Sequence, residues 1–209
     1  MPVRIKICGI TRPQDAVLAA RLGADALGMV FYPDSARAVS LEQAQTIARA
    51  VSAFVTLTAL FLDPEKQVVE KVLDTVPVNL LQFHGSEPGS FCRQFGRPYI
   101  KAVAMQDSAA AMAELQTEYA DAAGLVFDSH AAGAAGGTGQ TFDWSRLQSG
   151  SDNNLPIILA GGLTPDNVAT AIRQVRPWAV DVASGVESSP GVKDADKLER
   201  FITEVRNAS

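Results

Sequence analysis

Cysteine and histidine are scarce in this chain, which has two of each among its 209 residues. Cys8 and Cys92 lie far apart, and neither belongs to a CxxC or Cys/His pattern, so the sequence indicates neither a disulfide framework nor a zinc site. His84 and His130, taken with Asp128, share no recognised metal spacing. We therefore expect reduced thiols, as in the cytoplasm, and no metal ion.

Long hydrophobic runs and clusters of positive charge are also missing. The formal net charge is −5 and no run of lysine or arginine occurs, which argues against a nucleic-acid or anionic-membrane partner. The most apolar segment, residues 53–62, is too short for the roughly 20 residues that cross a bilayer. Residues 1–12 carry charges where a signal peptide needs an apolar core. These features predict a cytoplasmic protein that binds small molecules.

The chain does contain a regular alternation of short β-rich segments with longer amphipathic ones. Such an alternation, with short connections, predicts right-handed βαβ units and a parallel sheet. We expect eight strands, at residues 3–8, 26–31, 54–62, 79–84, 99–104, 124–128, 156–160 and 179–184.

Eight such units predict a (β/α)8 barrel, the TIM barrel, as a single domain over residues 1–209. An open doubly wound sheet is the alternative, but no GxGxxG follows the first strand, where a Rossmann cofactor site needs it. Barrel active sites form at the C-terminal ends of the strands, so polar residues at those ends are the candidates for function.

The first strand ends in a cysteine. Strand alternation places Val3, Ile5 and Ile7 on one face and Lys6 and Cys8 on the other. The apolar face should meet the helices, so Lys6 and Cys8 should point into the barrel. A neighbouring ammonium favours the thiolate, which makes Cys8 a candidate base. The alternative is a thiol packed as a small hydrophobe.

Two aspartates belong to later strands. Asp128 ends the sixth strand after an apolar run, and a carboxyl group in such surroundings is suited to general-acid catalysis, whereas an N-cap or turn aspartate is the alternative. Asp181 should point inward, one layer below the rim of the barrel. A buried carboxylate needs a partner, and we expect Lys6 or Arg4 to supply it.

The last two strands run into turns of small residues, with Gly161 and Gly162 after the seventh and Ser184 and Gly185 after the eighth. Barrels commonly hold phosphate in the loops after strands 7 and 8, on backbone N–H groups. Together the two turns indicate a phosphorylated substrate, although plain tight turns remain the alternative.

Three further polar residues follow the second and fourth strands. Arg37 is able to clamp a carboxylate in two parallel hydrogen bonds, or it is a solvated loop arginine. Gln82 and His84 can line a pocket, and a histidine beside a glycine is more often structural than catalytic. The glycine-rich segment 129–141, at the end where barrel sites form, is a candidate functional loop.

These segments together match a family. "KICGIT", "FYPDSAR", "LLQFHG", "GGTGQTFDW", "LAGGLTPDNV" and "VDVASGVESSPGVKD" resemble the phosphoribosylanthranilate isomerases of tryptophan biosynthesis. The resemblance implies an Amadori rearrangement of N-(5-phosphoribosyl)anthranilate to 1-(2-carboxyphenylamino)-1-deoxyribulose 5-phosphate, without metal or cofactor. In this family the loop that here reads "GGTGQ" sometimes carries lysine in place of Gln140, which leaves open whether the loop contributes charge.

The resemblance also implies roles for the residues. Asp128 becomes the general acid that opens the ribose ring, Cys8 the base that removes the proton from C2, and Arg37 the partner of the anthranilate carboxylate. Gly9 is expected to leave the substrate room to approach the sulfur. The predicted substrate-binding residues are Lys6, Arg37, Gln82, His84, Gly161, Gly162, Asp181, Ser184 and Gly185.

Three alternatives stay open at this point. A barrel isomerase of histidine biosynthesis catalyses the same rearrangement with two aspartates, and metal-using pentose-phosphate epimerases need more histidines at strand ends. A non-catalytic phosphate-binding barrel would have no reason to hold both Cys8 and Asp128. The expected partner is a small phosphorylated molecule, and the expected state is a monomer, with a homodimer as the alternative.

Overall fold

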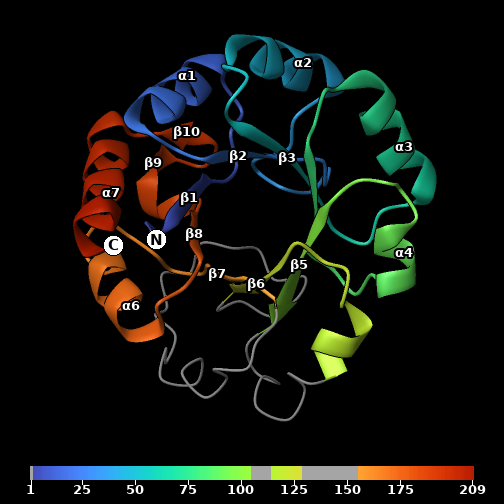
Figure 1. The fold of residues 1–209 in the computed structure, drawn as a ribbon. Helices are drawn as coiled ribbons and strands as arrows, with labels where there is room; N and C mark the ends of the chain where they lie inside the picture. Colours follow the sequence, from blue (N-terminus) through green and yellow to red (C-terminus); the bar gives the residue numbers. More distant parts are fainter. Residues whose placement is uncertain (1, 105–113, 129–154) are drawn as a thin grey trace.

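A closed barrel of eight parallel strands forms the centre of the molecule, as Figure 1 shows in a view along the barrel. The computed structural model describes residues 2–104, 114–128 and 155–209. The strands are β1 (Arg4–Ile7), β2 (Ala26–Val30), β3 (Thr56–Phe61), β4 (Leu80–Phe83), β5 (Tyr99–Ala104), β6 (Gly124–Asp128), β7 (Ile157–Leu159) and β8 (Ala179–Val182). The predicted TIM barrel is therefore confirmed, with each predicted strand in place.

Helices surround this barrel on the outside (Figure 1). They are α1 (Pro13–Leu22), α2 (Leu41–Ala50), α3 (Lys66–Thr75), the short α4 (Gly89–Arg93), α6 (Val168–Val175) and α7 (Ala195–Ala208). Local sequence sets their ends: Ser40 and Gln43 form a reciprocal capping box at the start of α2, and Gly23 ends α1 in the left-handed conformation. None of the helices in the described ranges is both long and apolar enough to cross a membrane.

The hydrophobic core has two main parts besides a small cluster around Cys8, and strand alternation explains the division between the two. Ile5 and Ile7 of β1 belong to the larger part, which fills the space between barrel and helices. A smaller cluster, with Ile100, Val126 and Ile158, fills the barrel interior. The alternation expected for the first strand is thus correct, and it directs the side chains of Lys6 and Cys8 inward.

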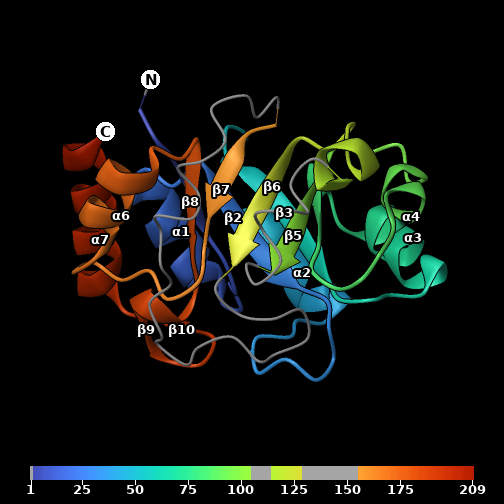
Figure 2. The ribbon, with the colours of Figure 1, turned by 90° about the horizontal axis from the view of Figure 1, so that it is seen from below.

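A small hairpin follows the last barrel strand. After β8 come the short 3-10 helix η3 (Ser184–Val186) and two antiparallel strands, β9 (Glu187–Ser189) and β10 (Val192–Lys193). Figure 2 shows this hairpin on the side of the barrel to which the strands point. The hairpin, which the strand pattern did not predict, therefore lies at the end where the candidate residues gather.

Candidate active site

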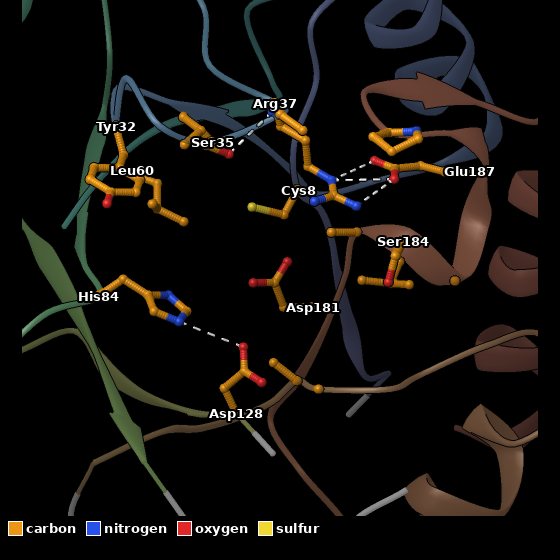
Figure 3. A pocket seen from close by; sticks show the side chains of 18 of the residues that line it. Cys8, Tyr32, Ser35, Arg37, Leu60, His84, Asp128, Asp181, Ser184 and Glu187 are labelled. Atoms are coloured by element: carbon orange, nitrogen blue, oxygen red, sulfur yellow. Dashed lines mark hydrogen bonds and ion pairs between the residues drawn. The ribbon is translucent and has the colours of Figure 1, made fainter. Parts of the chain in front are cut away.

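A cavity of about 790 Å³ opens at the C-terminal ends of the strands (Figure 3). Ten of the eleven residues predicted as catalytic or substrate-binding line it. They are Cys8, Arg37, Gln82, His84, Asp128, Gly161, Gly162, Asp181, Ser184 and Gly185. Lys6 does not belong to the lining and lies below it, almost fully buried.

Cys8 follows directly on β1, and its backbone N–H donates to the carbonyl of Val182 at 2.8 Å. The side chain is 7% exposed and packs in a small apolar cluster with Val30 and Leu60. A Cβ atom at Gly28, on the neighbouring strand, would lie 2.9 Å from the sulfur. Glycine at this position therefore leaves room for the thiol, a role that no sequence pattern indicated.

The pKa of Cys8 is set by burial as well as by the neighbouring lysine that the sequence indicated. Burial raises the pKa of the Cys8 thiol, and the lysine charges of Lys6 and Lys193 offset this only in part, while Asp181 raises the pKa further. Lys6 therefore lowers the pKa of Cys8, as predicted, but its effect is smaller than that of burial. The sequence reasoning omitted the desolvation of the sulfur and the charge of Asp181, which both raise the pKa.

Lys6 and Asp181 stand opposite each other in the register of β1 and β8. The ammonium lies 2.7 Å from the Asp181 carboxylate, which confirms the partner expected for this buried acid. Burial lowers the pKa of Lys6, but Asp181 and Cys8 outweigh that effect and the pKa is raised. Arg4, the other partner considered, pairs instead with Asp25 at 2.8 Å. Lys6 thus lies beneath the cavity and forms an ion pair with Asp181, which lines the cavity.

Asp128 and His84 face each other across one side of the cavity (Figure 3), with Nε2 of His84 3.7 Å from the carboxylate. Burial lowers the pKa of His84, and the charge of Asp128 offsets this only in part. The imidazole is therefore neutral at neutral pH. Its Nδ1 lies 3.3 Å from the side-chain amide nitrogen of Gln82, a buried residue of β4. The contact with Gln82 therefore fixes the orientation of the imidazole ring.

Three buried side-chain oxygen atoms on barrel strands have no hydrogen-bond partner among the described residues. They belong to Thr58 (Oγ1), Gln82 (Oε1) and Asp181 (Oδ1). A buried acceptor without a donor is costly. Because Gln82 and Asp181 line the cavity, their oxygens are suited to accept hydrogen bonds from the hydroxyl groups of a bound molecule.

Arg37 lies at the rim, where its guanidinium already holds a carboxylate that sequence reasoning missed. Its Nε and Nη2 donate to Glu187 of β9 at 2.9 and 2.7 Å. Figure 3 shows this pair beside Cys8. Glu187 in turn accepts from Lys193 at 2.9 Å. These two residues lie in the unpredicted hairpin, so no strand-end rule pointed to them, although both belong to the quoted "GVESSPGVKD" segment.

Gly9 serves a different purpose from the one expected. Its φ is +71°, and a Cβ atom there would lie 2.5 Å from Cδ of Arg37. Gly9 does not line the cavity. The expectation that it makes room for a substrate at the sulfur was therefore wrong, because the space that it leaves is filled by the Arg37 side chain.

The two glycine turns converge. Gly161 and Gly162 have φ values of +78° and +66°, and no acceptor among the described residues takes their backbone N–H groups. A Cβ atom at Gly185 would overlap the carbonyl of Leu163, so the turn after β8 packs directly on the turn after β7. Asn167 closes the first turn, donating to the carbonyl of Gly162 at 2.9 Å. Free amides at this place can bind an anion.

The structure does not test the predictions for the loop 129–141 and for its residues His130 and Gln140, because this segment lies outside the described residues. Within the described ranges, no group of three or more histidine, cysteine or acidic side chains is arranged to hold a metal ion. A thiol, a carboxyl group and two glycine turns with free amides, which meet in one barrel mouth, are the arrangement of an enzyme that acts on a small molecule by acid–base chemistry.

Comparison with known proteins identifies the family. The family model for N-(5'-phosphoribosyl)anthranilate (PRA) isomerase matches residues 5–204. The N-(5'-phosphoribosyl)anthranilate isomerase of Azotobacter vinelandii is 50% identical over 206 residues, covering 99% of this chain and 98% of its own length. The enzyme of Nitrosococcus oceani is 49% identical over 202 residues, 97% of each chain. The chain belongs to the phosphoribosylanthranilate isomerase family.

A solved structure agrees with this assignment. The phosphoribosyl anthranilate isomerase of Thermotoga maritima superposes with a TM-score of 0.89 at 39% identity, over 98% of this chain and 99% of the other. The resemblance predicted from the sequence motifs is therefore confirmed.

Proposed function

We propose that this barrel isomerises N-(5'-phosphoribosyl)anthranilate to 1-(2-carboxyphenylamino)-1-deoxyribulose 5-phosphate, with Cys8 as general base and Asp128 as general acid. The chain is an isomerase of tryptophan biosynthesis by its family. One structure of phosphoribosyl anthranilate isomerase, with a TM-score of 0.86 and 39% identity, holds the reduced form of that product. The observation that carries the proposal is that Cys8 and Asp128 line one cavity with the two anion-binding turns.

The acid step opens the sugar. Asp128 donates its proton to the ring oxygen, the bond from C1 to that oxygen breaks, and the anilinic nitrogen forms an iminium at C1. His84, kept neutral by burial, which lowers its pKa, stands 3.7 Å from the carboxyl group and can orient it without adding a competing positive charge.

The base step moves the double bond. The thiolate of Cys8 removes the proton at C2, which the adjacent iminium has made acidic, and the electrons of that C–H bond give the enolamine. Protonation at C1 and loss of the proton from the 2-hydroxyl oxygen then give the ketone. Because burial raises the pKa of Cys8, its thiolate is scarce but strongly basic, as proton abstraction from carbon requires.

Binding contacts follow from the free groups around the cavity. Glu187 occupies Nε and Nη2 of Arg37, so the remaining Nη1 side of the guanidinium takes the anthranilate carboxylate. The phosphate lies on the amides of the turns at Gly161–Gly162 and Ser184–Gly185. Asp181, whose Oδ1 has no partner among the described residues, accepts from a sugar hydroxyl, and Lys6 supports it from below.

Steady-state kinetics on phosphoribosylanthranilate, followed by loss of its fluorescence, test the assignment. Cys8→Ser and Asp128→Asn should each lower kcat by about 10²- to 10⁴-fold, the usual contribution of a general acid or base, while product still binds. Cys92→Ser is the matched control, since Cys92 is equally a free buried thiol but lies outside the cavity lining. Near-normal turnover in either of the first two variants would refute the assignment.

Four further properties belong to the same proposal. The enzyme works as one domain over residues 1–209, as a cytoplasmic monomer, and needs no cofactor, so that turnover should be equal with and without a chelator. A relative from Thermotoga maritima, 37% identical, is described as dimeric. Sedimentation equilibrium distinguishes the two states here, and a dimer mass at micromolar concentration would overturn the monomer.

A further inference from the structure

Lys193 is buried at the mouth of the barrel although it belongs to no barrel strand. Its side chain is fully inaccessible, and it is carried by β10, whose backbone N–H at Lys193 donates to Asp15 of α1 at 3.0 Å. A lysine is almost never buried completely unless its charge is paired. The reaction as derived above gives this residue no part.

The ammonium of Lys193 joins the ends of two barrel strands. It donates to the carbonyl of Cys8 at 2.6 Å and to the carbonyl of Ala183 at 3.0 Å. The third contact, at 2.9 Å, goes to Glu187. An ammonium has three donors, so each one is used. Cys8 follows β1 and Ala183 follows β8, and both are therefore fixed by one side chain.

Glu187 extends the connection to the rim. Its carboxylate accepts from Lys193 and also contacts Arg37 through two guanidinium nitrogens, the contact drawn in Figure 3. Burial raises the pKa of Glu187, but hydrogen bonds from both cations outweigh that effect and the pKa is lowered. Two positive charges thus face one negative charge, and the carboxylate of a bound substrate would balance the remaining charge.

We propose that Lys193 is a positioning residue that, together with Glu187, holds the base Cys8 and the carboxylate clamp Arg37 in one fixed arrangement. The inference rests on the proposed function and deepens it. Lys193 does not touch the substrate. It sets the backbone from which the thiol projects, and Glu187 sets which side of the guanidinium faces the cavity. A misplacement of about 1 Å in such a group can cost about 10²-fold in rate.

Lys101 provides a matched control. It is also a buried lysine, 3% exposed, whose ammonium donates to the carbonyls of Gly85 and Ala102 at 2.6 and 2.8 Å and lies 3.4 Å from a carboxylate oxygen of Glu87. It does not line the cavity. Lys193→Met and Lys101→Met therefore remove the same kind of side chain from two comparable networks, only one of which reaches Cys8.

The test combines kinetics with a measurement on the thiol itself. Both variants should lose stability in urea. Only Lys193→Met should lower kcat, by about 10- to 100-fold, with a smaller change in KM. It should also slow the alkylation of Cys8 by iodoacetamide at fixed pH, followed by peptide mass spectrometry, since a nearby positive charge that favours the thiolate is gone. Equal effects of both variants on kcat and alkylation would overturn the proposal.

Glu187→Gln keeps the experiment decisive if Lys193→Met does not fold. The amide retains the shape and an acceptor but no longer fixes Arg37 with a charge, so KM should rise by about tenfold, roughly the loss of one charge-assisted hydrogen bond, with kcat changing less. Unchanged KM would overturn the proposal. Turnover of phosphoribosylanthranilate by the wild type tests the proposed function separately, and Cys8 alkylation needs no substrate. A failure of the proposed function can therefore be distinguished from a failure of the positioning role of Lys193.

Discussion

Replacing Lys6 by methionine tests how the barrel interior controls the thiol. Lys6 and Asp181 are 4% and 6% exposed, and the 2.7 Å contact between them is the one hydrogen bond that the Asp181 carboxylate accepts among the described residues. Methionine has a similar length and no charge, so Lys6→Met leaves a buried carboxylate with neither oxygen paired.

The expected loss of stability is about 3–5 kcal/mol, the usual cost of removing one partner of a buried ion pair. The same substitution should raise the pKa of Cys8 further. Burial raises this pKa, and the charge of Lys6 is the main effect that opposes the rise. Without Lys6 that opposition is lost, and the remaining charge of Asp181 raises the pKa as well.

Urea unfolding measures the free energy of unfolding. The rate of Cys8 alkylation as a function of pH gives the midpoint at which the thiol titrates. In Lys6→Met the midpoint should move to higher pH. Lys6→Met/Asp181→Leu, which removes the pair together, should recover most of the stability and move the midpoint back. The reasoning is refuted if the double variant is as unstable as the single one, or if the midpoint of Lys6→Met equals that of the wild type.

Two further predictions concern the phosphate turn and the acid-side histidine. Gly185→Ala places a Cβ atom on the carbonyl of Leu163, so inorganic phosphate should protect the variant against thermal unfolding less than it protects the wild type, and equal protection would contradict the packing of the two turns. Burial lowers the pKa of His84 below its ordinary value of 6.5, so the unfolded state binds the proton first. Its contribution to stability is full above pH 6.5 and declines as the pH falls toward the folded pKa. The non-titrating His84→Gln should therefore lose less stability than the wild type between pH 6.5 and 5 in urea titrations, and parallel curves would show that His84 is not responsible.

The fold was predictable because its signals are local and repeated. Each strand is a short apolar run with turn residues after it, and in β1 the alternation of two residues decides which side chains enter the barrel. The pairing of Lys6 with Asp181 followed from the same reasoning, since both were expected inside the barrel and a buried carboxylate needs a cation. The hairpin after β8 has strands of three and two residues, too short for an alternation to be visible.

The electrostatics of the site were less predictable, because they depend on distances between residues far apart in the chain. The sequence shows Lys6 two positions from Cys8, but the pKa of the thiol also depends on its burial and on Asp181, which lies 175 residues beyond Lys6. Arg37 and Glu187 are 150 residues apart, and only folding brings them together. Sequence reasoning therefore predicted Cys8, Asp128 and the pair of Lys6 with Asp181, but missed Glu187 and Lys193, which contact Arg37 and the backbone of Cys8.

The raised pKa of Cys8 has a consequence for the order of events. Lys6 is paired with Asp181, and burial favours the neutral form of the Cys8 thiol. The iminium formed by ring opening would bring a positive charge next to the sulfur and lower the cost of the thiolate. In the mechanism proposed above, Cys8 therefore becomes available as the base mainly after Asp128 has acted as the acid, and the same desolvation that makes the thiolate scarce makes it a stronger base toward C2. A barrel that instead stabilised the thiolate fully with a free lysine would hold a weaker base, which is why the carboxylate beside Lys6 matters for the chemistry as well as for the fold.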